Sequence, residues 1–211
     1  MREGRAPGPA SPADGRAAAA RPRLEAGYFD ALYAASADPW HFATSAYEQA
    51  KYDRTLAALD GRRFARALEV GCSIGILSTR LAACCEELVA VDVAQRAVEL
   101  ARARLAGCDH VRIERRRLPE ELPDGTWDLI VCSEVLYYWD RATLERALGR
   151  FTRALRPGGA LLAVHWRQPT RTYPLRGDEV HALLRAQPGL RHVAGHVEAH
   201  YRLDRYDRAG P

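Results

Sequence analysis

The chain has 211 residues, of which 47% are hydrophobic and 27% are charged. This length and composition are typical of a single domain that can bury an apolar core. Arg and Lys exceed Asp and Glu by only four charges, so we expect no nucleic-acid partner. No stretch is apolar enough to cross a membrane, and no secretion signal opens the chain. We therefore expect a cytoplasmic protein without a membrane partner.

The cysteine and histidine patterns give no indication of a metal site. Five cysteines are an odd number, two of them are adjacent, and none forms a C-x-x-C pair. A disulfide framework or a structural zinc site is therefore not expected, and a reducing compartment fits the pattern. His192, His196 and His200 fall in a segment with β periodicity, where they project onto the solvated face. We predict no metal ligands.

The first 23 residues differ in composition from the rest. They are mostly Arg, Ala, Pro and Gly, with no large apolar residue after Met1. Such a segment cannot bury enough surface to offset its ordering entropy, so we predict a disordered tail over residues 1–23. From Leu24 the composition indicates a single folded domain, residues 24–211. Two helices, 24–34 and 47–59, are predicted at its start, with a turn at Asp38-Pro39-Trp40 between them.

Short apolar strands then alternate with amphipathic helices. This alternation predicts an α/β fold with a parallel sheet covered by helices on both faces. After a short helix, two more strands follow, and the second has the half-exposed pattern of an antiparallel strand. The predicted strands are 67–70, 88–91, 111–114, 127–132, 160–164, 190–193 and 197–203, and the helices between them are 75–83, 94–106, 141–155 and 177–187.

The most informative motif lies where the first predicted strand meets its helix, in Glu69-Val70-Gly71-Cys72-Ser73-Ile74-Gly75. Glycines permit a sharp turn there, and the following helix offers unpaired amides to a ligand. Asp92 ends the next strand, 21 residues after Gly71, which is near the spacing at which an acid reaches ribose hydroxyls. The motif lacks the G-x-G of a dinucleotide site. The Glu69 carboxylate would repel a pyrophosphate and suits an amino group.

The pattern E-x-G-x-x-x-G followed by an acid resembles motif I of class I S-adenosylmethionine-dependent methyltransferases. Asp38-Pro39-Trp40, Tyr47-Glu48 and the segment 133–138 (SEVLYY) resemble the NodS family of N-methyltransferases. The resemblance to class I methyltransferases covers about residues 45–205. It implies a Rossmann-like, seven-stranded, mostly parallel sheet with one antiparallel strand, and residues 24–60 as a helical lid. It also implies S-adenosyl-L-methionine as cofactor and the free amine of a deacetylated glucosamine unit as acceptor.

Cofactor contacts are predicted at the carboxyl ends of the strands and on the lid. Aromatic residues can shield a sulfonium. Many methyltransferases place an Asp on the adenine amine after the third strand, but Arg115-Arg116-Arg117 stands here, so we expect the backbone near Leu118 to hold adenine. The predicted cofactor-binding residues are Trp40, Tyr47, Glu69, Gly71, Cys72, Gly75, Asp92, Val93, Leu118 and Ser133.

Three residues are candidates for the chemistry. His165 ends a buried strand and has the side chain best suited to take a proton from an amine. Glu134 and Tyr137 follow the strand that ends at Cys132, and either can orient the acceptor. We expect methyl transfer to a small-molecule amine. Alternatives are an O-methyltransferase acting on a sugar or secondary-metabolite hydroxyl, and a cofactor-binding module without catalysis.

Overall fold

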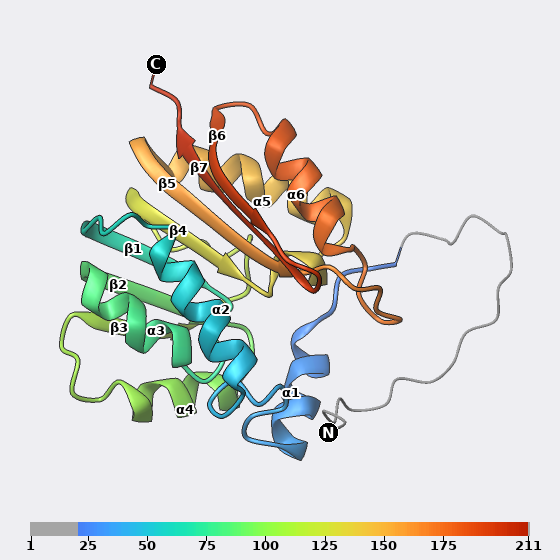
Figure 1. Cartoon of the computed structure of the whole chain (residues 1–211). Helices are drawn as coiled ribbons and strands as arrows, with labels where there is room; N and C mark the ends of the chain where they lie inside the picture. The colour runs from blue at the N-terminus through green and yellow to red at the C-terminus, as the bar shows by residue number, and fades with distance from the viewer. Residues whose placement is uncertain (1–20, 211) are drawn as a thin grey trace, which may run out of the picture.

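A seven-stranded sheet with helices on both faces forms the centre of the computed structural model, which describes residues 21–210 (Figure 1). The strand order is β3-β2-β1-β4-β5-β7-β6. Only β7 runs in the direction opposite to the other six strands, which confirms the predicted class I methyltransferase fold. The strands are β1 Phe64–Val70, β2 Cys85–Asp92, β3 Val111–Arg115, β4 Trp127–Ser133, β5 Leu155–Trp166, β6 Leu190–Val197 and β7 Tyr201–Arg208.

The helices divide between the two faces of this sheet. Side chains of α2, α3 and α4 pack on one face, and those of α1, α5 and α6 pack on the other. The bounds are α1 Ala26–Ala35, α2 Ala46–Ala57, α3 Ile76–Leu81, α4 Gln95–Arg104, α5 Arg141–Ala154 and α6 Gly177–Ala186, with short 3-10 helices η1 Ala82–Cys84 and η2 Leu136–Tyr138. Among the residues that the structure describes, no helix is long and apolar enough to span a membrane.

Strand β4 shows why the strands are apolar almost without interruption. Leu129 and Val131 contribute to the core on the α3 side, whereas Ile130 and Cys132 contribute to the core on the α5 side. All four side chains are fully buried. Because both faces of a parallel sheet are covered, neither set of alternating positions can be polar without a cost in desolvation.

Two predicted boundaries are wrong. Residues 21–23, which we assigned to the tail, lie against the domain, and the Arg21 side chain donates to the Tyr173 carbonyl at 3.2 Å. The predicted strand 197–203 is divided by a turn. Val197 ends β6, and the Glu198 N–H donates to the Tyr201 carbonyl at 2.9 Å as the hairpin closes. The apolar alternation continued across this turn and concealed it. The remainder of the predicted tail lies outside the described residues.

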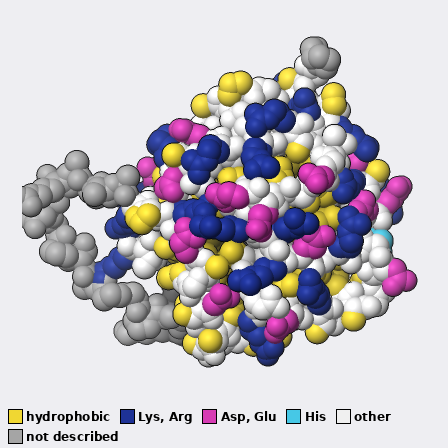
Figure 2. Space-filling view, turned by 180° about the vertical axis from the view of Figure 1, so that it is seen from behind, with side chains coloured by type: hydrophobic (Ala, Val, Ile, Leu, Met, Phe, Trp, Pro, Cys, Tyr) yellow, Lys and Arg dark blue, Asp and Glu magenta, His cyan; other side chains and the backbone are white. Residues whose placement is uncertain are grey.

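Charges on the surface are mixed. Figure 2 shows arginine and acidic side chains interleaved over one face, without a continuous basic area there. Many of these groups pair, as Arg66 does with Glu87 at 3.1 Å and Arg156 with Asp128 at 3.1 Å. Exposed pairs of this kind contribute little stability, at most about 1 kcal/mol each. They account for a high arginine content with a small net charge.

The turn from β1 to α3 requires glycine. Gly71 has a φ of 77°, and a Cβ added there would lie 2.8 Å from Val135 Cγ2. Gly75, the N-cap of α3, has a φ of 80°, and an added Cβ would lie 3.1 Å from Ala101 Cβ. The backbone in this turn therefore comes closer to its neighbours than any side chain would allow.

We expect Gly71→Ala to lower the melting temperature, because left-handed backbone costs an L-residue about 1–2 kcal/mol before the clash with Val135 is counted. Gly149→Ala is the matched control. Gly149 lies inside α5 with only the end of Arg153 nearby, so alanine there should stabilise the protein by about 0.5–1 kcal/mol. Thermal unfolding of both variants tests this, and equal shifts of the same sign would contradict it.

Candidate functional site

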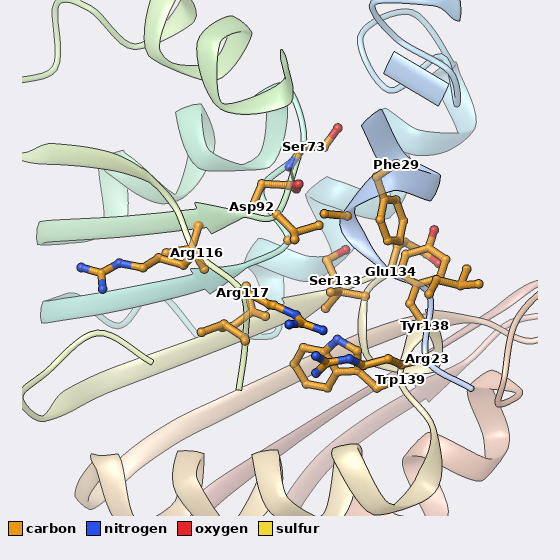
Figure 3. Close-up of a pocket in the computed structure, with 18 of the residues that line it drawn as sticks. Arg23, Phe29, Ser73, Asp92, Arg116, Arg117, Ser133, Glu134, Tyr138 and Trp139 are labelled. Carbon is orange, nitrogen blue, oxygen red and sulfur yellow. Dashed lines mark hydrogen bonds between the residues drawn. The ribbon is translucent and has the colours of Figure 1, made fainter. Parts of the chain in front are cut away.

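A pocket opens at the carboxyl ends of β1, β2 and β4, and α1 covers one side of it (Figure 3). Residues from the segment before α1, from the loop after β3 and from η2 complete the wall. Ligands of open α/β sheets bind at this edge. The lining includes Arg23, Glu25, Phe29, Tyr33, Trp40, Phe42, Gly71, Ser73, Asp92, Val93, Arg116, Arg117, Leu118, Ser133, Glu134, Tyr138 and Trp139.

Asp92 is held firmly at the end of β2. One carboxylate oxygen accepts the Ser73 N–H at 2.9 Å, and the other accepts the Ala94 N–H at 2.9 Å. Burial raises the pKa of Asp92 from its usual range, although these backbone donors oppose the shift. Figure 3 shows Asp92 and Ser73 adjacent at the mouth of the pocket. A carboxylate fixed in this way has remaining lone pairs for two neighbouring hydroxyl groups.

Ser73 is a contact that the sequence analysis missed. Its backbone is left-handed, with a φ of 51°, and its hydroxyl lies 2.5 Å from the Tyr33 hydroxyl. This hydrogen bond connects the β1–α3 turn to α1. Its only sequence signal was its position within the glycine motif. Tyr33 carried no signal, because its role depends on how α1 packs over the sheet.

Six of the ten predicted cofactor residues line the pocket: Trp40, Gly71, Asp92, Val93, Leu118 and Ser133. The other four do not. Cys72 is buried among side chains of α3 and α4, and Gly75 lies in the turn below. Tyr47 packs edge-on against Trp166 and Tyr201, with ring centroids 6.3 Å away in each case. These three residues therefore lie outside the wall of the pocket, contrary to the expected placement.

Glu69 is also placed away from the pocket, because strand alternation decides its direction. Its neighbour Val70 lines the pocket, so Glu69 points to the opposite face, where the Ser78 hydroxyl donates to it at 2.5 Å. Burial raises the pKa of Glu69 to about 8. Burial therefore favours the uncharged acid, and the side chain that we assigned to a ligand's amino group points away from the pocket.

The charges on the wall of the pocket balance. Three arginines and three carboxylates line it: Arg23, Arg116, Arg117, Glu25, Asp92 and Glu134. Arg23 pairs with Glu25 at 2.9 Å and with Glu120 at 2.8 Å. Arg117 also pairs with Glu25, at 2.6 Å. Since these guanidinium groups already have carboxylate partners, the pocket suits an uncharged or zwitterionic ligand better than a pyrophosphate.

Glu134 is the most constrained side chain in the site. Its backbone is left-handed, with a φ of 56°. Its Oε1 accepts from Lys51 Nζ at 2.6 Å, and its Oε2 accepts from the Trp166 N–H at 3.0 Å and from the Tyr137 hydroxyl. A non-glycine residue in this conformation persists only where its surroundings fix it, and such positions concentrate at functional sites. Glu134 therefore remains a candidate for acceptor contact.

Lys51 on α2 is the second residue that the sequence analysis missed. It is 2% exposed and lies between Glu48 and Glu134, with its Nζ 3.0 Å from Glu48 Oε1. The two carboxylates outweigh the cost of burial and raise the pKa of Lys51 above its usual range. Burial raises the pKa of Glu48 as well. In the sequence, Glu48 belongs to the Tyr47-Glu48 segment that resembles the NodS family, but nothing there indicated that Lys51 is its ion-pair partner.

His165, the predicted general base, does not lie on the wall of the pocket. It has no exposed surface, its Nε2 accepts the Leu136 N–H at 3.2 Å, and its Nδ1 faces His181 Nε2 at 3.2 Å. Burial, with His181 and Lys51 nearby, lowers the pKa of His165 well below its usual range. Both ring nitrogens already have partners, so the structure places this imidazole as a support for the η2 segment.

Tyr137 is likewise a supporting residue. It is 3% exposed, it does not line the pocket, and its hydroxyl donates to Glu134. Its ring stacks on Tyr173 with centroids 4.8 Å apart. Of the three predicted catalytic residues, only Glu134 reaches the pocket.

The protein family described as nodulation protein S (NodS) matches residues 31–170 of the chain. Nodulation protein S of Bradyrhizobium diazoefficiens is 38% identical over 128 residues, which are 59% of this chain and 61% of that protein. The chain thus spans about three fifths of the length of that relative.

Solved structures show similar folds. A protein from Pseudomonas syringae described as a methyltransferase is 42% identical, with a TM-score of 0.69 over 77% of this chain and 99% of that one. The N-methyltransferase NodS from Bradyrhizobium japonicum, solved with S-adenosyl-L-homocysteine, has a TM-score of 0.78 at 23% identity over 87% of this chain and 97% of that one. The second likeness supports the fold alone.

The raised pKa of Glu69 predicts a stability that depends on pH. A group whose pKa is higher in the folded state contributes stability that is fully present below its unfolded pKa of about 4.5 and is lost as the pH rises through about 8. Relative to Glu69→Gln, the wild type should therefore lose stability across this range, so the difference in melting temperature between the two proteins should change in favour of Glu69→Gln as the pH rises. Glu99→Gln, on the exposed surface of α4, should differ from the wild type by nearly the same amount over this range. A difference between wild type and Glu69→Gln that does not change with pH would contradict the assignment.

Proposed function

The chain belongs to the NodS family, and from this premise we propose that it transfers a methyl group from S-adenosyl-L-methionine to an amine of a small molecule. The favoured acceptor is the free amine of an amino sugar. The observation that carries the proposal is one pocket with the fixed Asp92 carboxylate at one side and the triply hydrogen-bonded Glu134 carboxylate at another.

The residues present fit this cofactor. Asp92 offers carboxylate lone pairs to ribose hydroxyls, as an acid at the end of a second strand commonly does. Leu118 and Val93 provide apolar wall for an adenine ring, and Trp40 and Phe42, stacked with centroids 5.5 Å apart, form an aromatic wall. Aromatic faces stabilise a nearby cation by about 0.5–2 kcal/mol, so this wall suits a sulfonium.

When bound, S-adenosylmethionine supplies an electrophilic methyl group. The chain's own part in such a displacement is to position the two reactants and exclude water. We propose that Phe29 and Tyr33 of α1 close the pocket, with residues 24–60 acting as a lid. Glu134 orients the acceptor by accepting a hydrogen bond from its amino group, since a buried carboxylate favours an N–H donor that can carry positive charge.

Removal of the Asp92 carboxylate should weaken cofactor binding. Asp92→Ala deletes a charge-assisted acceptor worth about 1.5–3 kcal/mol, which corresponds to a loss of roughly tenfold or more in affinity for S-adenosylhomocysteine. Isothermal titration calorimetry measures this, with Asp109→Asn, an exposed residue outside the pocket, as control. Unchanged affinity in a folded Asp92→Ala protein would refute the role of Asp92, and tighter binding of NAD than of S-adenosylhomocysteine would refute the proposed cofactor.

Methyl transfer itself can be followed with radiolabelled S-adenosylmethionine and a chito-oligosaccharide carrying one free amine. We expect N-methylation of this acceptor and none of its fully acetylated counterpart. Glu134→Gln should lower kcat/KM by at least about tenfold because it removes the charge that orients the amine, while affinity for S-adenosylhomocysteine stays within about threefold of wild type.

Other results of this assay distinguish the alternatives. Methylation of the acetylated oligosaccharide would indicate an O-methyltransferase. Cofactor binding without transfer to either sugar, or to a panel of simple amines and alcohols, would favour a binding module without catalysis.

A further inference from the structure

Lys51 is the only lysine in the chain, because 30 of the 31 basic residues are arginine. This lysine is also among the few buried charged groups, at 2% exposure. Arg and Lys differ in shape: a guanidinium is a wide planar fork, whereas an ammonium is a compact point charge. The position of the single lysine therefore indicates a site where a compact cation fits and an arginine does not.

The contacts of Lys51 connect α2 with the pocket. Its Nζ lies 2.6 Å from Glu134 Oε1 and 3.0 Å from Glu48 Oε1, and 5.5 Å from the centre of the Tyr47 ring. Helix α2 begins at a cap, where the Ser45 hydroxyl accepts the Glu48 N–H at 3.4 Å. This cap fixes the first turn, and so fixes the distance from Glu48 to Lys51 on the next.

One cation between two carboxylates leaves a net charge of minus one. Removal of either partner from a buried ion pair is costly, because the remaining charge stays in a low dielectric without compensation. Other titratable groups lie near Glu134, and none of them supplies a second cation: Tyr47 and Tyr52 from α2, and Tyr137 and Tyr138 from η2. His165 of β5 lies near Lys51, and burial lowers its pKa well below the usual range.

We propose that Lys51 is a positioning residue, which holds the Glu134 carboxylate in place and turned toward the acceptor side of the pocket. With Glu48, it leaves that side one unit negative, a charge suited to an acceptor amine. This inference rests on the proposed function. It extends that function, because it assigns the control of the charge on the acceptor side of the pocket to Lys51 of α2.

Two inhibitors separate this inference from the proposed function. S-Adenosylhomocysteine has an uncharged thioether at the reacting position, whereas sinefungin carries a protonated amine there. Wild-type protein should bind sinefungin the more tightly, because a carboxylate faces the amine. Lys51→Met should reduce the ratio of the two affinities by about tenfold, since Glu134 then lacks the ion pair that holds its carboxylate toward the amine. Glu48→Gln should reduce it less, because the Lys51–Glu134 pair remains.

A double-mutant cycle tests whether Lys51 acts through Glu134. In the Glu134→Gln background, Lys51→Met should change the affinity ratio by less than about twofold, because the group that it positions is already neutral. This double variant leaves only Glu48 without its cationic partner, whereas Lys51→Met alone leaves both Glu48 and Glu134, so the double variant should be the more stable of the two. Additive effects of the two substitutions, or an unchanged ratio in a folded Lys51→Met protein, would overturn the inference. Failure of both inhibitors to bind wild-type protein would refute the proposed function instead.

The single lysine provides a direct spectroscopic test as well. Protein labelled with ¹³Cε-lysine should give one lysine resonance from Lys51. We expect that resonance to move in Glu134→Gln, and to move more on addition of sinefungin to wild-type protein than on addition of S-adenosylhomocysteine. A resonance that is the same in wild type and Glu134→Gln would show that Lys51 does not sense Glu134, and would overturn the assignment.

Discussion

The hydrogen bond from the Ser73 N–H to Asp92 joins the turn after β1 to the end of β2. Two neighbouring parallel strands end there, and the chain must leave each of them in a different direction. Gly71 and Gly75 provide the left-handed backbone that the first exit requires, and Asp92 captures the amide that this conformation exposes. Without this hydrogen bond, the turn after β1 would not be fixed against the end of β2. The Ser73 hydroxyl would then not be held in position for Tyr33 of α1.

Features determined by local pattern were predictable from the sequence. The strands, most helices and Asp92 depend on periodicity and on spacing within about twenty residues. The sequence does not show which residues of these strands point toward the pocket. Helices cover both faces of the sheet, so residues on both faces are apolar and no alternation distinguishes them. Glu69 and His165 were misplaced for this reason. Lys51 was missed because its partner Glu134 is 83 residues away, and only the packing of α2 beside the end of β4 brings them together.

The chain uses its charges in two different ways. Most arginines lie at the surface with acidic neighbours, where water screens the interaction and the exact pairing matters little. The side chains of Glu48, Lys51 and Glu134 are largely shielded from water, so their charges interact mainly with one another. A buried ion group adds little stability compared with apolar packing. Its retention beside a pocket is therefore better explained by the charge that it presents there.

The support for Glu134 comes from both sides of the sheet edge. On the α2 side, Lys51 holds one carboxylate oxygen. On the α6 side, the Leu136 N–H donates to His165, which contacts His181, and His181 in turn donates to Asp204 of β7 at 2.7 Å. This second chain of polar contacts fixes the η2 segment that carries Tyr137. The two sets of contacts converge on Glu134, whose backbone is left-handed. A carboxylate that is stationary before the acceptor arrives needs no reorganisation when the amine binds.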